Sequence, residues 1–187
     1  EMPEWRPPPS LLRFLDSGEP PVYVGFGSVP VRDPAGEVAR WAEAARRAGT
    51  RALLYPAAGF TDWDRDYGEH VHLVRFAPHD WLLPRTAAAV HHGGAGTTHG
   101  ALAAGVPQGV IPFSLDQPYF ARRVAALGLG PGGLDPGRTD VEGLTRILTD
   151  LTRGERAEGY RRRAREAARA VERENGARTA ARILLGS

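Results

Sequence analysis

Short apolar runs alternate with longer segments of helical periodicity along most of the chain. The apolar runs predict buried strands of about five residues at 22–26, 51–55, 71–76, 87–91, 109–113 and 129–134. Apolar residues spaced by three and four predict helices at 11–16, 35–48, 80–85, 97–104, 118–127, 140–152, 155–173 and 175–185. Strands that alternate with helices are typical of a parallel sheet covered on both faces. We therefore predict an α/β domain of three layers, αβα, around a parallel sheet of about six strands.

The first residues stand apart from this alternation. Residues 1–9 are rich in proline and predict a linker that enters from an upstream segment. Ser10 can cap the short helix that follows, which stops at Ser17 and Gly18. We assign residues 1–20 to an interdomain linker with a short helix, and residues 21–187 to one α/β domain.

Composition excludes several classes of enzyme. All 24 strongly basic residues are arginines, and the chain has neither lysine nor cysteine. P-loop lysines and Schiff-base lysines are therefore excluded, as are disulfides, thiolate nucleophiles and cysteine-based zinc sites. A formal net charge of +2 argues against nucleic acid as a partner. Residues 153–187 nevertheless hold ten arginines against five acidic residues, which makes them either a solvated helix face or a surface for an anion or a membrane.

Apolar runs are too short for a membrane span, and the N-terminus lacks the apolar core of a signal peptide. We therefore expect a cytoplasmic location without a transmembrane segment, with peripheral membrane contact left open by the arginines.

A glycine-rich turn, His-His-Gly-Gly-Ala-Gly-Thr-Thr at 91–98, follows the fourth predicted strand. Gly93, Gly94 and Gly96 remove side chains where backbone would approach a ligand. The helix expected to begin at Thr97 points unpaired amides and a positive end at the same place, which suits a phosphate. A plain turn with a threonine cap is the alternative. The dinucleotide pattern Gly-x-Gly-x-x-Gly is not met, because its third glycine is missing.

Two adjacent histidines end the fourth strand and must point to opposite sides of it. They cannot chelate one metal together, and no ligand cluster at metal spacing accompanies them. We interpret His91 as a core histidine and His92 as a donor to an anion. After the fifth strand, Asp116 and Gln117 can hydrogen-bond vicinal hydroxyls of a sugar, or Asp116 can simply cap the next helix. Both loops lie at carboxyl ends of strands, where parallel sheets bind ligands.

The motifs together resemble the C-terminal domain of family 1 glycosyltransferases with the GT-B fold, especially bacterial enzymes of the glycopeptide-antibiotic type and sterol glucosyltransferases. The matching segments are Pro-Val-Tyr-Val-Gly-Phe-Gly-Ser at 21–28, Asp-Trp-Leu-Leu-Pro at 80–84, the turn at 91–98, and residues 105–107, 112–117 and 121–124. The resemblance implies a Rossmann-like domain, one half of a GT-B fold, that binds a nucleotide-sugar donor. The acceptor and the catalytic base would belong to an N-terminal domain, which residues 1–187 do not supply.

The resemblance also implies roles for individual residues. Phe76 would stack on the base, Ala77 would read its edge through backbone groups, and His79 would contact the ribose. The diphosphate would be bound by Ser28, His92 and the turn residues Gly93, Gly94, Gly96 and Thr97. Asp116 and Gln117 would hold the sugar hydroxyls. His92 would stabilise the leaving group, so no catalytic base is expected in this domain.

Two positions depart from the family, and the first of them leaves the choice between uridine and thymidine open. Gly100 stands where plant relatives have a ribose-binding glutamate, and Phe76 stands where many relatives have a stacking tryptophan.

The sequence thus predicts the donor-binding domain of an inverting, metal-independent hexosyltransferase that needs no cofactor. It would use a UDP- or dTDP-sugar and a hydroxyl of a small lipophilic or natural-product acceptor, as in antibiotic biosynthesis, and would be inactive alone. Two alternatives are a noncatalytic nucleotide-sugar-binding module and a sugar-nucleotide hydrolase or epimerase on the same fold.

Overall fold

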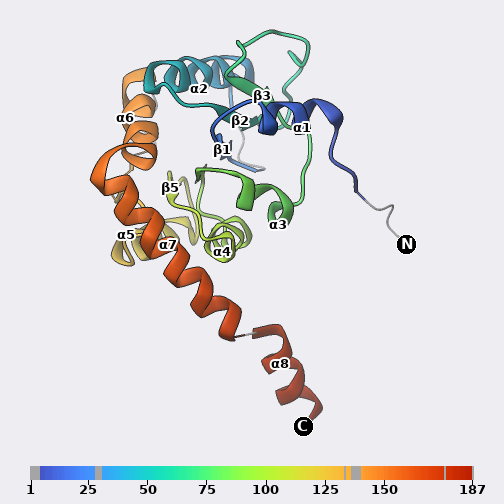
Figure 1. Cartoon of the computed structure of the whole chain (residues 1–187), viewed down its shortest axis with the longest axis vertical. Helices are drawn as coiled ribbons and strands as arrows, with labels where there is room; N and C mark the ends of the chain where they lie inside the picture. The colour runs from blue at the N-terminus through green and yellow to red at the C-terminus, as the bar shows by residue number, and fades with distance from the viewer. Residues whose placement is uncertain (1–4, 28–30, 133, 136–139, 175, 187) are drawn as a thin grey trace.

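Five parallel strands form one sheet in the order β3-β2-β1-β4-β5 in the computed structural model, which describes residues 5–27, 31–132, 134–135, 140–174 and 176–186 (Figure 1). The strands are β1 (Val22–Gly25), β2 (Ala52–Tyr55), β3 (Val71–Leu73), β4 (Ala88–His91) and β5 (Gln108–Val110). The helices are α1 (Pro9–Asp16), α2 (Pro34–Ala48), α3 (His79–Leu82), the 3-10 turn η1 (Leu83–Arg85), α4 (Ala95–Ala104), α5 (Gln117–Ala126), α6 (Val141–Thr152), α7 (Gly154–Glu174) and α8 (Gly176–Leu185).

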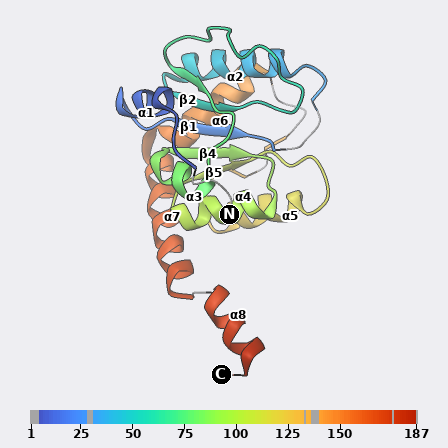
Figure 2. The same cartoon turned by 90° about the vertical axis from the view of Figure 1, so that its right-hand side faces the viewer.

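Helices cover both faces of this sheet, so the prediction of a three-layer α/β domain is confirmed (Figure 2). Alternate residues of a strand point to opposite faces. Val24 of β1 therefore packs with Trp41 of α2 and Leu148 of α6 on one side. Its neighbour Tyr23 packs on the other side among α1, η1 and α4, for example with Leu83. Both faces are buried, which is why the strands read as continuous apolar runs.

The sheet has five strands among the described residues rather than about six. The segment predicted as a sixth strand, 129–134, lies beside β5, and the Gln108 N–H donates to the Leu129 carbonyl at 2.9 Å. A side chain at Gly130 would meet the Gln108 carbonyl oxygen at 1.8 Å, so this backbone passes very close to β5. Pro131 has no N–H to extend a ladder. The contact therefore stops after one bond, and the apolar character of Leu129 reflects burial.

The strand order reverses beside β1. β2 and β3 lie on one side of it and β4 and β5 on the other, with Gly25 of β1 opposite His91 of β4. All pairs are parallel, so the carboxyl ends share one edge. Ligands bind at such a reversal in open α/β sheets. The fold thus brings the loop after Gly25 next to the turn after His91.

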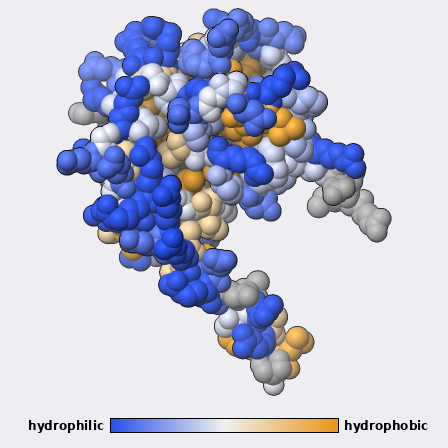
Figure 3. Space-filling view, viewed as in Figure 1, coloured by the Kyte–Doolittle hydropathy of each residue, from blue (hydrophilic) through white to orange (hydrophobic). Residues whose placement is uncertain are grey.

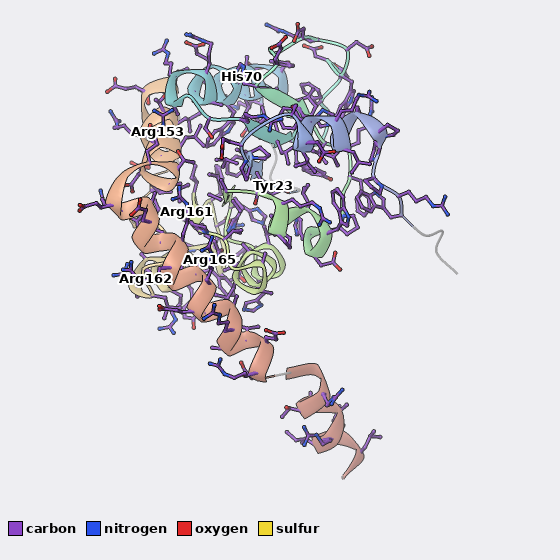
Figure 4. All side chains as sticks on the ribbon, in the orientation of Figure 1. Tyr23, His70, Arg153, Arg161, Arg162 and Arg165 are labelled. Carbon is purple, nitrogen blue, oxygen red and sulfur yellow. The ribbon has the colours of Figure 1, made fainter. Side chains whose placement is uncertain are left out.

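The basic C-terminal segment forms α7 and α8, and its polar surface follows α7 in Figure 3. Arg153 donates to the Gly49 carbonyl at 3.0 Å, and Arg161 on α7 donates to the Thr152 carbonyl at 2.5 Å (Figure 4). Both carbonyls lie at helix C-terminal ends, where guanidinium groups are stabilising. Two of the arginines therefore have a structural use. No helix in the described part of the chain is long and apolar enough to cross a membrane.

Candidate functional site

The N-terminus of α4 presents amide groups that no side chain of the described residues caps. The helix begins at Ala95, two residues earlier than predicted, with Gly94 as its N-cap. The hydroxyl of Thr98 donates back to the Gly94 carbonyl at 2.9 Å, so the alternative of a threonine cap is wrong. A glycine cap carries no side chain to occupy the first helical amides. The amides of Ala95, Gly96 and Thr97 remain donors for a ligand.

His92 lies between two glycine loops. A Cβ atom on Gly94 would lie 2.4 Å from its Nε2, and one on Gly27 would lie 3.2 Å from its Cε1. Only glycines leave room for the ring in this position. Its Nδ1 is buried and has no hydrogen-bond partner among the described residues. A buried nitrogen without a partner is costly, so a ligand that supplies one would be favoured here.

Burial lowers the pKa of His92, and the negative charge of Asp116 opposes part of that effect. The imidazole is therefore neutral near pH 7 in the empty site. A neutral ring has one donor and one acceptor nitrogen, and it becomes a double donor when an anion favours its protonation.

Gly93 shapes the turn through an inward-facing amide. Its N–H donates to Nδ1 of His91 at 3.0 Å, and its φ of +91° lies in the region that favours glycine. A Cβ there would lie 2.7 Å from Cγ1 of Val110. His91 is fully buried, which confirms the interpretation as a core histidine. The Gly93 amide is thus already occupied, and the open donors of the turn come after it.

A cavity of about 300 Å³ adjoins this turn at the carboxyl edge of the sheet. Predicted site residues line it from α3, from α4 and from the loop after β3: Phe76, Ala77, His79 and Thr97. The ring of Phe76 is 60% exposed and can stack on a planar group. Nε2 of His79 lies 3.4 Å from the Tyr23 hydroxyl, and the two rings meet edge to face. Gly27, which packs against the His92 ring, also lines the cavity.

Asp116 and Gln117 occupy the next loop, after β5. Oε1 of Gln117 accepts from the N–H groups of Phe113 and Ser114 at 2.8 and 3.1 Å, so its carbonyl holds the loop. Asp116 occupies the N-cap position of α5, but its side chain makes no capping bond, so the cap-only alternative is wrong. The carboxylate is exposed and free to meet a ligand.

The structure gathers the described site residues on neighbouring loops at one edge, while Ser28 lies outside the described residues. Sequence reasoning missed Tyr23 and Gly27, which contact His79 and His92. A signal existed in the Tyr-x-Gly-x-Gly spacing from 23 to 27, since a Cβ on Gly25 would meet the Tyr23 hydroxyl at 2.3 Å. A larger hollow of about 760 Å³ lies beside α6, away from these loops, and its Asp150 is already paired with Arg156 at 3.2 Å.

The chain is similar in sequence and in fold to several known proteins. Residues 63–178 match the family described as erythromycin biosynthesis protein CIII-like, C-terminal domain. The vancomycin aglycone glucosyltransferase of Amycolatopsis orientalis is 41% identical over 186 residues, which cover 98% of this chain and 43% of that protein. The sterol 3-beta-glucosyltransferase UGT80A2 of Arabidopsis thaliana is 41% identical over 127 residues, covering 68% of this chain and 20% of that protein.

Among solved structures, Os79 from O. sativa in complex with UDP has a TM-score of 0.73 and 25% identity, covering 84% of this chain and 37% of that one. The chain spans less than half the length of these relatives. The family match contains every predicted site residue except Ser28.

Proposed function

Because the chain belongs to the family of erythromycin biosynthesis protein CIII-like C-terminal domains, the donor halves of GT-B glycosyltransferases, we propose that it binds the nucleotide-sugar donor of a hexosyltransferase. The observation that carries the proposal is His92. Its ring lies against Gly27 and Gly94 beside the open amides of α4, and its buried Nδ1 has no hydrogen-bond partner among the described residues. These hydrogen-bond donors and the positive end of the helix suit a diphosphate without a lysine.

The donor then extends along the edge of the sheet. The base stacks on Phe76 beside Ala77, and the ribose lies near His79, because these residues share the cavity next to the turn. The diphosphate meets His92, the α4 amides and Ser28. The sugar reaches Asp116 and the Nε2 group of Gln117, since Oε1 of Gln117 is occupied by backbone amides.

In the proposed mechanism, an acceptor hydroxyl attacks the anomeric carbon in line and inverts it. A base from a separate acceptor-binding domain takes the hydroxyl proton as the new C–O bond forms and the bond to the diphosphate breaks. His92 and the α4 amides stabilise the charge that develops on the leaving diphosphate. In other transferases a divalent cation stabilises the charge on the leaving diphosphate. Here the fixed hydrogen-bond donors would stabilise it, so we propose a metal-independent reaction without a cofactor.

Two relatives are named for vancomycin aglycone and sterol acceptors, which supports a lipophilic or natural-product acceptor for this protein too. We place the reaction in the cytoplasm, where nucleotide sugars are available. Product analysis with labelled donor separates transfer from the alternatives. A hydrolase releases free sugar, an epimerase returns an isomeric nucleotide sugar, and a noncatalytic module changes nothing.

Titration calorimetry with nucleoside diphosphates and their sugar conjugates tests donor binding directly. We expect UDP and dTDP to bind, with GDP weaker because the larger purine fills a cavity of only about 300 Å³. Gly100 lies beside His79, with 3.6 Å between its Cβ position and Cβ of His79, and places no carboxylate near the ribose. UDP and dTDP should therefore differ by less than about tenfold in affinity, since no charged hydrogen bond selects the 2′-hydroxyl. Failure of every nucleotide to bind contradicts the proposal.

Donor binding should take up protons near pH 6.5. Burial lowers the pKa of His92 in the empty site, and a diphosphate beside the ring raises it, so binding shifts the ring toward its charged form. UDP-glucose is the suitable ligand, because its diphosphate does not titrate near neutral pH. Calorimetry in buffers of different ionisation enthalpy measures the uptake. A His92→Gln variant, which does not titrate, should lack it; equal uptake by this variant assigns the proton to another group.

A further inference from the structure

His91 makes two hydrogen bonds that fix the orientation and the tautomer of its ring. It is the last residue of β4 and is fully buried. Nδ1 accepts from the Gly93 N–H, and Nε2 lies 3.0 Å from Oε1 of Gln108. An amide N–H can only donate, so Nδ1 must be unprotonated; Nε2 then carries the proton and donates to the Gln108 carbonyl. The two partners thus select one tautomer.

The bond from Gly93 bends the backbone at the start of the turn. With this amide directed inward, the positive φ of Gly93 turns the residues that follow, and Gly94 lies against the His92 ring. On the other side, Gly93 touches Val110 and the Gln117 backbone, so the bend also joins the turn to the loop that carries Asp116. Loss of the acceptor at Nδ1 would leave a buried N–H unpaired, and the turn would shift to find another partner.

The surroundings keep this acceptor available. Burial lowers the pKa of His91 to about 4, the contact with Gln108 opposes part of that effect, and His92 and His79 lower the value further. At neutral pH the ring is therefore uncharged. Gln108 is itself fully buried, and its Nε2 has no partner among the described residues, so its carbonyl bond to His91 orients it.

We infer that His91 is a positioning residue for the donor: its Nδ1 holds the Gly93 amide and so fixes the turn from which His92 and the α4 amides meet the diphosphate. The inference rests on the proposed function. If His91 served packing alone, a substitution that loses Nδ1 and one that loses Nε2 would both change stability, and neither would change donor affinity selectively. A positioning residue makes donor affinity depend on the nitrogen that faces Gly93.

Two substitutions of His91 distinguish the role of Nδ1 from that of Nε2. In His91→Asn the side-chain oxygen takes the position of Nδ1 and can still accept from Gly93, whereas in His91→Gln the amide nitrogen takes the position of Nε2 and leaves Gly93 without an acceptor. We expect the Asn variant to bind UDP within about threefold of the parent and the Gln variant about tenfold more weakly, with thermal unfolding confirming that both are folded. Equal affinities, or an equal loss in both, overturn the inference.

A measurement on the parent protein covers the case in which a variant does not fold. Nitrogen-15 NMR should show an unprotonated Nδ1 and a protonated Nε2 for His91, and the Gly93 amide should be protected from exchange with and without UDP. A protonated Nδ1 or a rapidly exchanging Gly93 amide overturns the inference. A parent that binds no nucleotide instead overturns the proposed donor function, so the two failures are distinguishable.

Discussion

Replacement of His92 by alanine is expected to lower turnover by at least about 100-fold in an enzyme that joins this domain to its acceptor-binding half. The ring stands where charge develops on the leaving diphosphate, and its contribution grows in the transition state. Its Nδ1 has no hydrogen-bond partner among the described residues, so the loss of this atom breaks no hydrogen bond there. Initial rates with UDP-glucose and thermal unfolding of the same sample measure the two effects separately.

His92→Gln is the matched control for this experiment. A glutamine retains one uncharged donor of similar reach but cannot become a cation. Its turnover should lie between that of the parent and that of the alanine variant. Turnover of the alanine variant within threefold of the parent would remove His92 from the role of leaving-group stabiliser.

The second large effect is expected at Gly93. Alanine there should destabilise the domain by about 3 kcal/mol, because the backbone holds φ at +91° and the new Cβ would lie 2.7 Å from Cγ1 of Val110. The backbone carbonyl oxygen of Gln117 would lie 3.1 Å from the same Cβ, so the new methyl group could not move away from Val110 in that direction. Urea unfolding followed by circular dichroism gives the change in the free energy of unfolding.

Gly94 and Gly96 provide internal controls for Gly93. The three atoms nearest to a Cβ on Gly94 all belong to the His92 ring, and the backbone there has an ordinary φ of −61°. Gly94→Ala should therefore weaken UDP binding by displacing that ring and leave stability nearly unchanged. A Cβ on Gly96 meets nothing within 4 Å, so Gly96→Ala should unfold no earlier than the parent. Equal stability of the Gly93 and Gly96 variants would contradict the described turn.

Prediction from the sequence succeeded where one local pattern decides the outcome. The buried strands β1, β2 and β4 were found within one residue at each end, because runs such as 22–26 are apolar on both faces. It was wrong at 129–134, where Leu129 is buried for a reason unrelated to strand pairing. It also placed the start of α4 at Thr97, because threonines are good caps, although glycine serves as the cap.

For the site, the sequence identified which loops matter but not how their polar groups are used. The Gly93 amide was expected to face a ligand, and it is bound to His91. The side chain of Gln117 was expected to face a sugar, and its carbonyl is bound to the backbone of its own loop. These hydrogen bonds join residues two to four positions apart and depend on the conformation of each turn, which residue types alone do not specify.

By itself, then, the sequence determined the layered α/β fold and the loops that form the site, since both follow from local periodicity and from small or polar residues at strand ends. Only the tertiary structure decided which groups remain free. The parallel sheet brings the loops after β1, β4 and β5 together, and packing there turns some donors inward and leaves His92, Asp116 and the α4 amides exposed to a ligand. The physical reason is that most buried polar groups find a hydrogen-bond partner, and the partner that each finds depends on the assembled structure.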